Sequence, residues 1–400
     1  MVSFKHLATL LVAAWPLGSA NPLPEIRAAT VVEGKYIVTL RDGIGASALG
    51  LHMNWVRDVH QRSLGRRQLS FVGVEKTFGV GSFNAYAGHF DAETLERIKN
   101  NPDVAEVEQQ TMHWPAGLVT QENSTHGLAT ISHRKPESFE YVYDDTAGEG
   151  TTVYVLDSGI EIGHEDFEGR ASHGYNAVKG SPDGDVMGHG THVAGTVGSK
   201  TYGVAKKTKL VDVKLFHDGG ATTEIILDGI EWAIKDVMDK KIEKRAVLNM
   251  SFGGSKSAAE NKLIKTAWDA GILCVIAAGN EGVDAKNSSP ASSPDGITVA
   301  AVDSKWELWK HSNYGSVVHI LAPGVEVLST YIGNDTAVKN DSGTSMAAPH
   351  VAGLAAYLAV AENIDTVKEL KARILALGTK GKAINVKQGT VNLVAYNGNR

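Results

Sequence analysis

Three short segments of the sequence carry residue types that can perform nucleophilic chemistry. Asp157 closes an apolar run and is followed at once by a serine and a glycine. His189 stands between two glycines, and Ser345 opens an alanine-rich stretch. Acyl transfer to water requires an activated hydroxyl, a base with a pKa near neutrality, and an acid that orients this base. The sequence supplies one of each, in the chain order Asp, His, Ser, so these three residues are predicted to act together.

Each of the three residues also has an ordinary structural interpretation. Asp157 is typical of a turn or a helix N-cap, and Ser345 is typical of an N-cap. His189 and His192 are three apart on a predicted helix and could bind a metal, but a zinc pair usually stands four apart with a glutamate between. We therefore expect His192 to be a packed structural histidine. The combination of the three segments favours catalysis.

A fourth segment ends at Asn280, which follows an apolar run and a glycine. Its side-chain amide can donate a hydrogen bond to an oxyanion. The backbone N–H of Ser345 is predicted to be a second donor, because the N-terminus of a helix presents N–H groups without internal partners and a partial positive charge. The sequence therefore predicts an oxyanion site beside Ser345.

Short apolar runs alternate with helical patterns from about residue 151 to residue 395. Continuous apolar strands separated by helices predict an α/β fold, a doubly wound and mostly parallel sheet with helices on both faces. In such sheets the active site lies at the carboxyl ends of the strands. The predicted strands are 152–156, 209–214, 246–250, 272–277 and 298–302, and the predicted helices are 189–198, 223–239, 258–270 and 345–360.

Ahead of this domain, residues 21–119 show a pattern of their own. The predicted order of elements is β-α-β-β-α-β, which is typical of a small ferredoxin-like α+β unit. Its helices are predicted at 46–64 and, capped by Asp91, at 92–100. The composition changes over 112–135, which predicts an exposed connector.

The start of the chain has the features of a secretory signal: Lys5, an apolar stretch at 7–15 and small residues up to position 20. The expected division is a signal peptide at 1–20, the small unit at 21–119 and the large domain at 120–400.

Composition argues against several classes of function. The formal net charge is -6 and no Lys/Arg-rich stretch occurs, so no nucleic-acid partner is expected. The apolar stretch at 7–15 is too short to span a bilayer, and 345–360 fits a buried core helix better than a membrane span. Cys274 is the one cysteine, which excludes an intrachain disulfide and is predicted to be a buried small hydrophobe. We expect a secreted, soluble monomer.

The three segments resemble those of the subtilases, most strongly the proteinase K branch. The resemblance is carried by Asp-Ser-Gly at 157–159, Gly-His-Gly-Thr-His at 188–192 and Gly-Thr-Ser-Met-Ala-Ala-Pro-His at 343–350. Nearly all of 21–400 is similar to secreted subtilisin-like proteases of dermatophytes and related filamentous fungi. The resemblance implies a serine endopeptidase with Ser345 as nucleophile, His189 as base, Asp157 as the orienting acid and Asn280 in the oxyanion hole.

The same resemblance implies how substrate and propeptide bind. Residues 21–119 would be an inhibitor-like propeptide, removed by self-cleavage near 119–121. Protein substrates would pair as an added strand, and main-chain pairing gives broad specificity because it does not read side chains. An apolar S1 pocket would favour large apolar P1 residues. The expected substrate-binding residues are Gly219, Gly220, Ala221, Ser251, Phe252, Gly253, Ala278 and Gly279, although glycine pairs are also typical of ordinary turns.

The chain departs from the family pattern where calcium would be expected. The resemblance implies a site in which the carbonyls of Pro294 and Gly296 face the ion. Calcium prefers oxygen ligands and negative charge, but His319 holds the place of the carboxylate, and Lys382 stands where a second site would have its acid. We expect no required cofactor, and weak or no calcium dependence at these two places.

Two further expectations concern modification and the rival class of function. Glycosylation sequons occur at five positions. Glycan is expected at Asn123, Asn287 and Asn334, because Asn249 should be buried and Asn340 lies close to Ser345 in the sequence. The rival interpretation is a catalytically silent subtilase fold used for binding or adhesion, whereas an active enzyme would degrade structural protein of a host or the environment, including a role in virulence.

Overall fold

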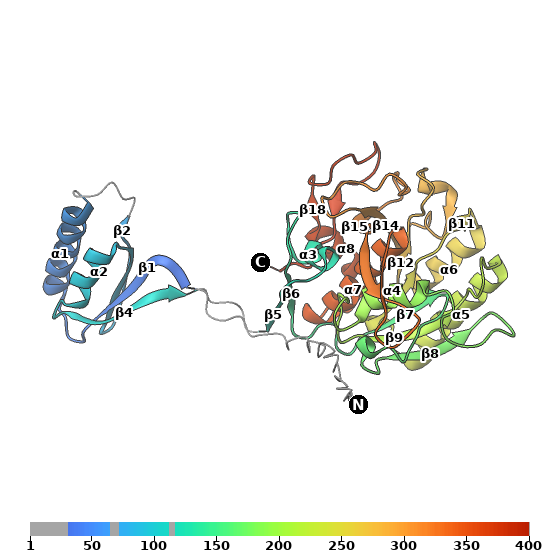
Figure 1. Ribbon diagram of the computed structural model, residues 1–400, viewed down its shortest axis with the longest axis horizontal. Helices are drawn as coiled ribbons and strands as arrows, with labels where there is room; N and C mark the ends of the chain where they lie inside the picture. The colour runs from blue at the N-terminus through green and yellow to red at the C-terminus, as the bar shows by residue number, and fades with distance from the viewer. Residues whose placement is uncertain (1–30, 65–71, 112–116, 400) are drawn as a thin grey trace, which may run out of the picture. The chain divides into compact units, whose positions relative to one another are not determined.

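The computed structural model describes residues 31–64, 72–111 and 117–399, which form two compact units divided between Leu118 and Val119 (Figure 1). Each unit has a sheet and a hydrophobic core of its own. The predicted signal peptide at 1–20 lies outside the described residues.

The small unit is an antiparallel sheet of strand order β2-β3-β1-β4 packed against two helices. Val38 of the sheet, Val56 of the first helix and Ile98 of the second are fully buried in its core. Asp91 caps the second helix, as predicted, by accepting from the N–H groups of the second and third residues after it. The elements are β1 (Val31–Leu40), α1 (Ala46–Leu64), β2 (Gly73–Val80), β3 (Phe83–His89), α2 (Ala92–Lys99) and β4 (Val104–Thr111), which confirms the predicted order.

The large unit is built on a nine-stranded sheet of order β18-β19-β15-β14-β12-β10-β7-β9-β8. The pairs from β19 to β8 are parallel, and only the edge pair of β18 with β19 is antiparallel. This arrangement confirms the predicted mostly parallel sheet. The strands are β7 (Thr152–Asp157), β8 (Ala171–Asn176), β9 (Lys209–Lys214), β10 (Ala246–Met250), β12 (Leu273–Ala277), β14 (Ile297–Val302), β15 (Ile320–Pro323), β18 (Thr379–Lys380) and β19 (Leu393–Val394).

Helices cover both faces of this sheet, because successive side chains of each buried strand point to opposite sides. Along β7, Val153 and Val155 face one core cluster, while Tyr154 and Leu156 face the other. The first cluster contains α3 (His126–Ser132), α4 (His189–Gly198), α7 (Thr344–Ala361) and α8 (Val367–Leu377), and the second contains α5 (Thr223–Lys240) and α6 (Ala258–Asp269).

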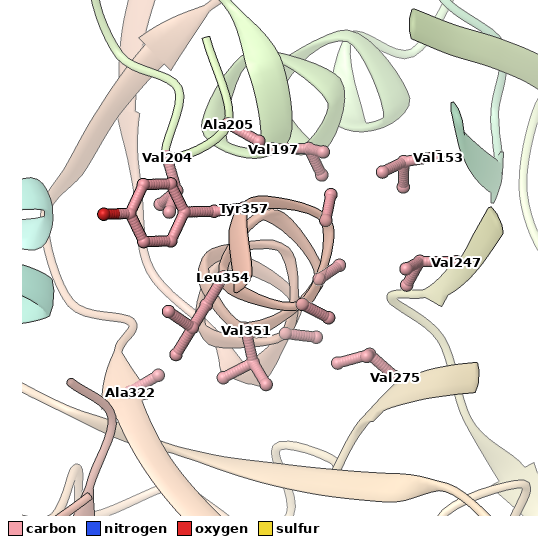
Figure 2. Packing of buried hydrophobic residues seen from close by; sticks show 14 of the residues in the cluster. Val153, Val197, Val204, Ala205, Val247, Val275, Ala322, Val351, Leu354 and Tyr357 are labelled. Carbon is pink, nitrogen blue, oxygen red and sulfur yellow. The ribbon is translucent and has the colours of Figure 1, made fainter. Parts of the chain in front are cut away.

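Helix α7 forms the centre of the first cluster. Figure 2 shows it end-on, with Val153, Val247 and Val275 of three neighbouring strands on one side of it. Its length and hydropathy would suit a membrane span, but 83% of the 18-residue window that passes this test is buried inside the protein. It is therefore a core helix, as the sequence predicted.

The prediction of an exposed connector over 112–135 was wrong for residues 117–135, the part of this range that the structure describes. Strand β5 (Leu118–Gln121) pairs with β6 (Tyr141–Asp144), and α3 follows between them. Leu128 and Ile131 of α3 are fully buried, because this short helix fills the first cluster beside α7. The remaining short strands are β11 (Gly254–Ser255) with β13 (Ser288–Ser289), and β16 (Val327–Thr330) with β17 (Val338–Asp341).

Candidate active site

Asp157 and His189 form a hydrogen-bonded pair at the carboxyl end of β7. Asp157 is 1% exposed, and its Oδ1 lies 2.7 Å from His189 Nδ1. The same oxygen accepts from the Ser158 N–H at 2.8 Å. An ionised carboxylate can only accept hydrogen bonds, so the ring proton resides on Nδ1 and the Nε2 atom of His189 is left as a base.

The loops around this pair are held by buried polar contacts. His189 is the first residue of α4, and the following Gly190 packs against the loop after Asp157: a Cβ on Gly190 would lie only 2.1 Å from the Gly159 carbonyl oxygen. A side chain at this position would push α4 away from β7. The buried amino group of Lys214 donates to the carbonyls of Ser158 and Gly184, which joins the loop after β7 to the loop before α4.

Asp185 organises the start of α4, a role that the sequence analysis missed. Its Oδ1 accepts from the Met187 and Gly188 N–H groups and from the Ser158 hydroxyl, at 2.8–2.9 Å. Its Oδ2 accepts from both the N–H and the hydroxyl of Thr191. An acid four residues ahead of a predicted helix start was the available signal, because carboxylates near a helix N-terminus satisfy its free N–H groups.

Ser345 is the second residue of α7, and Gly343, not Ser345, is the N-cap. The N-cap interpretation of Ser345 was therefore wrong, because its hydroxyl does not cap α7. Pro349 lies four residues further along and has no N–H to offer the Ser345 carbonyl. The Ser251 hydroxyl donates to that carbonyl at 2.8 Å instead, and Ser345 Oγ donates to the Ser251 carbonyl at 3.0 Å. This reciprocal pair fixes Ser345 to the segment after β10.

The fold brings Ser345 to the same sheet edge as Asp157. Met250 pairs in register with Leu156, so Ser251, the first residue after β10, comes level with Asp157, the last residue of the neighbouring β7. No hydrogen bond joins Ser345 Oγ to His189 within the described residues; the hydroxyl is turned to Ser251. Hydrogen bonds between catalytic groups are often long or misaligned in enzymes without substrate and tighten in the complex.

Charges around His189 favour its protonated form. Burial of the ring lowers its pKa, but the charge and hydrogen bond of Asp157, with the charges of Asp341 and Asp185, raise it more. The pKa of His189 therefore lies above its ordinary value of 6.5. The ring is still reachable from solvent, since the His189 side chain is 33% exposed.

Asn280 is held against the start of α7 with its amide oriented. Its Oδ1 accepts from the Thr344 N–H and from the Thr344 hydroxyl, both at 2.9 Å. A backbone N–H can only donate, so the oxygen must face Thr344 and the Nδ2 atom faces the other way. The amide nitrogen lies beside Gly343, where a Cβ would be 3.5 Å from it. Thr344 was missed from the sequence because this contact joins segments 64 residues apart.

The expected substrate-binding residues lie in three segments, two of which are connected by an aromatic pair. The exposed Gly219 and Gly220 follow β9, and a Cβ on either would meet nothing within 4 Å. The rings of Phe216 and Phe252 pack edge to face, with centroids 5.7 Å apart, which brings this loop to the Ser251–Gly253 segment. Ala221 is half-buried and Gly253 is exposed; Ala278 is fully buried and Gly279 half-buried, next to Asn280.

Two predictions about other polar residues can be checked directly. His192 is fully buried, and its Nε2 lies 2.9 Å and 3.0 Å from the carbonyl oxygens of Val327 and Lys339, so it is a packed structural histidine as predicted. Asn249 is fully buried, also as predicted. The other four sequon asparagines are exposed: Asn123, Asn287, Asn334 and Asn340.

Known families match both units of the chain. Residues 148–390 match the subtilase family, Peptidase_S8, and residues 35–113 match the peptidase inhibitor I9 family. The large match contains Asp157, His189 and Ser345.

Curated relatives cover the whole chain. An alkaline proteinase of Hapsidospora chrysogena is 48% identical over 410 residues, and alkaline protease 1 of Aspergillus flavus is 46% identical over 404 residues; each alignment covers 100% of both chains. The crystal structure of a cold adapted subtilisin-like serine proteinase is 37% identical with a TM-score of 0.64, covering 69% of this chain and 99% of that one. The chain is therefore a serine endopeptidase of the subtilase family that carries an N-terminal I9 inhibitor domain.

Proposed function

We propose that the protein is a secreted endopeptidase of broad specificity, in which Ser345, His189 and Asp157 form the catalytic relay. The observation that carries the proposal is the 2.7 Å bond from His189 Nδ1 to the buried Asp157, which leaves Nε2 as the free base at the mouth of the site. The family membership supports the same roles.

The first half of the reaction forms an acyl-enzyme. Ser345 Oγ turns from the Ser251 carbonyl to His189, which takes its proton as the Oγ–C bond to the substrate carbonyl forms. Asp157 stabilises the resulting imidazolium and stays ionised. The imidazolium then gives this proton to the leaving amine as the peptide C–N bond breaks.

The second half repeats these steps with water. His189 takes a proton from water, the hydroxide adds to the acyl carbon, and the proton returns to Ser345 Oγ as the ester bond breaks. Both halves pass through an oxyanion. Asn280 Nδ2 and the first-turn N–H of Ser345 are the donors that would bind it.

Removing the Asn280 donor should lower turnover without weakening substrate binding. Asn280→Leu is expected to reduce kcat by about 10²–10³-fold, the loss that removal of one oxyanion donor causes in subtilisin, with little change in KM. Steady-state kinetics on a peptide substrate measure both constants. A kcat within twofold of the unchanged enzyme would exclude Asn280 as a donor.

Thr344 offers a matched pair of controls. Thr344→Val removes the hydroxyl that orients Asn280 but keeps the N–H, so kcat should fall roughly tenfold, as for one lost neutral hydrogen bond. Thr344→Ser keeps both groups and should retain kcat. Equal losses in the two variants would mean that packing, not the hydroxyl, matters at this position.

The pH dependence of kcat/KM should report His189. The base must be neutral in the free enzyme, and its pKa is raised above 6.5. Activity is therefore expected to be full at alkaline pH and to be lost as the pH falls through a value above 6.5. A pH profile on a peptide substrate measures this limb; a limb well below pH 6 would contradict the proposed environment of His189.

Substrate is proposed to bind as a strand between two loops. The exposed glycines at 219–220 and at Gly253 leave the main chain of both segments open to pairing. Residues 277–279 are proposed to wall an S1 pocket for large apolar P1 side chains. Chromogenic peptides that differ only at P1, with phenylalanine in one and aspartate in the other, test the substrate preference. Ser345→Ala tests the chemistry separately.

Residues 21–119 are proposed to act as an intramolecular inhibitor, cut near 119–121 by the enzyme itself. A contact within the large unit supports keeping Gln121 in the mature enzyme: its side-chain amide donates to the Thr201 carbonyl at 3.0 Å. We further propose that the protein is secreted after removal of residues 1–20 and that the mature enzyme is a monomer. It would carry glycan at the exposed Asn123, Asn287 and Asn334. N-terminal sequencing and intact mass of the protein from culture medium test these points together.

Peptide hydrolysis distinguishes this proposal from a silent binding protein. Mature protein is expected to release the chromophore from a peptide with phenylalanine at P1. Correctly processed protein without any turnover would favour binding or adhesion.

A further inference from the structure

The loop before β14 is tied to helix α8 by the side chain of one lysine. Lys371 Nζ donates to the carbonyl of Pro294 at 2.8 Å and to the carbonyl of Gly296 at 2.7 Å. It also lies 3.2 Å from His319 Nε2 and 5.5 Å from the centre of the Trp268 ring. The amino group is thus surrounded by two main-chain oxygens, a ring nitrogen and an aromatic face.

These two carbonyls are the ones that would face a calcium ion by family resemblance. The residues present do not fit that ion. Calcium takes six to eight oxygen ligands, whereas His319 presents a nitrogen and Lys371 brings a positive group onto the same two oxygens. Burial lowers the pKa of the Lys371 amino group, and the negative charge of Asp295, in the same loop, opposes this lowering only in part.

We propose that the Lys371 amino group takes the place of a metal ion here, so that this chain fastens the 289–296 loop with a covalently attached cation and binds no calcium at this point. Loop and helix are then joined permanently, whatever the calcium concentration. The proposal does not depend on the catalytic roles assigned above.

Thermal unfolding of the mature enzyme, blocked with a covalent serine-protease inhibitor against self-digestion, tests the fastening. Lys371→Met leaves two carbonyls without their donor, so Tm should fall by roughly 3–8 °C. The loss should be the same in excess chelator and in millimolar calcium. Lys368→Met is the matched control, because Lys368 is exposed on the same helix and its replacement should leave Tm unchanged. A Tm for Lys371→Met equal to that of the control would overturn the proposal.

A second pair of variants tests whether the Lys371 amino group keeps calcium away from the carbonyls of Pro294 and Gly296. The combination Lys371→Met with His319→Asp removes the amino group and supplies a carboxylate, at a position held in register by the His319 N–H bond to the Thr298 carbonyl. Added calcium should raise the Tm of this double variant by more than it raises the Tm of the unchanged enzyme. His319→Asp alone should show no such gain, because the amino group still covers the two oxygens. An equal gain in the single variant would show that Lys371 does not exclude the ion.

Discussion

Replacing Ser345 by alanine is expected to lower kcat by about 10⁶-fold, the loss that removal of the nucleophile causes in subtilisin. Among the residues that the structure describes, the Ser345 hydroxyl bonds to the Ser251 carbonyl alone, so its removal breaks one hydrogen bond there and should leave the fold intact. Peptide hydrolysis measures the loss, and circular dichroism of the same sample checks the fold. A variant with more than about one thousandth of the normal kcat would exclude Ser345 as nucleophile.

The same variant tests maturation. Made without other proteases, Ser345→Ala should accumulate as a precursor that still contains the I9 domain. A trace of active enzyme is then added to the precursor. Cleavage by this added enzyme would mean that the precursor is a good substrate and lacks only the nucleophile. Loss of the propeptide from this variant in the absence of other proteases would mean that the cleavage does not need Ser345.

Asp157→Asn is expected to reduce kcat/KM by about 10⁴-fold at neutral pH. Asn is nearly isosteric, so the buried site is filled, but the negative charge that stabilises the imidazolium is lost. Because Asp157 raises the pKa of His189, the acid limb of the pH profile should also move to lower pH. Both effects are read from one set of rate measurements across pH.

Asp341→Asn is the comparison for this charge effect. Asp341 also raises the pKa of His189, but without a hydrogen bond to the ring. A shift of the acid limb in the same direction, with a much smaller loss of kcat/KM, is therefore expected. Equal losses in the two variants would mean that Asp157 acts only through long-range charge and has no orienting role.

Several elements that pack the core could be predicted closely from the sequence, but the fully buried strand β15 was missed. The bounds of α1, α4, β9 and β10 equal the predicted ones, because apolar residues recur in each at the spacing of a helix or a strand. Edge strand β8 was missed because only one of its six residues is buried and it has no run of apolar side chains to mark it. Its place is set by pairing with β9, a contact that local sequence does not encode.

Helix α8 was missed although its signal was present. Leu370, Ile374 and Leu377 recur at helical spacing and are buried. Thr366 and Glu369 form a capping pair at its start: Thr366 Oγ1 accepts from the Glu369 N–H and donates to the Glu369 carboxylate.

The site shows the same division between local pattern and long-range contact. The meeting of Asp157 and His189 was predictable, since Asp157 ends a strand and His189 begins a helix at the carboxyl edge of a parallel sheet. The contacts that orient the other groups join distant segments, as Asn280 to Thr344 and Ser251 to Ser345. The place of the Lys371 amino group, beside residues of a loop 75 positions away, was likewise beyond sequence patterns.

Labelling of mature enzyme with phenylmethanesulfonyl fluoride tests the central assignment most directly. The reagent sulfonylates a serine hydroxyl only where a neighbouring base activates it. Intact mass should show one adduct, peptide mapping should place it on Ser345, and remaining activity should fall in proportion to labelling. Loss of hydrolysis with Ser345 unmodified, or hydrolysis that persists after Ser345 is fully labelled, would contradict the proposed relay.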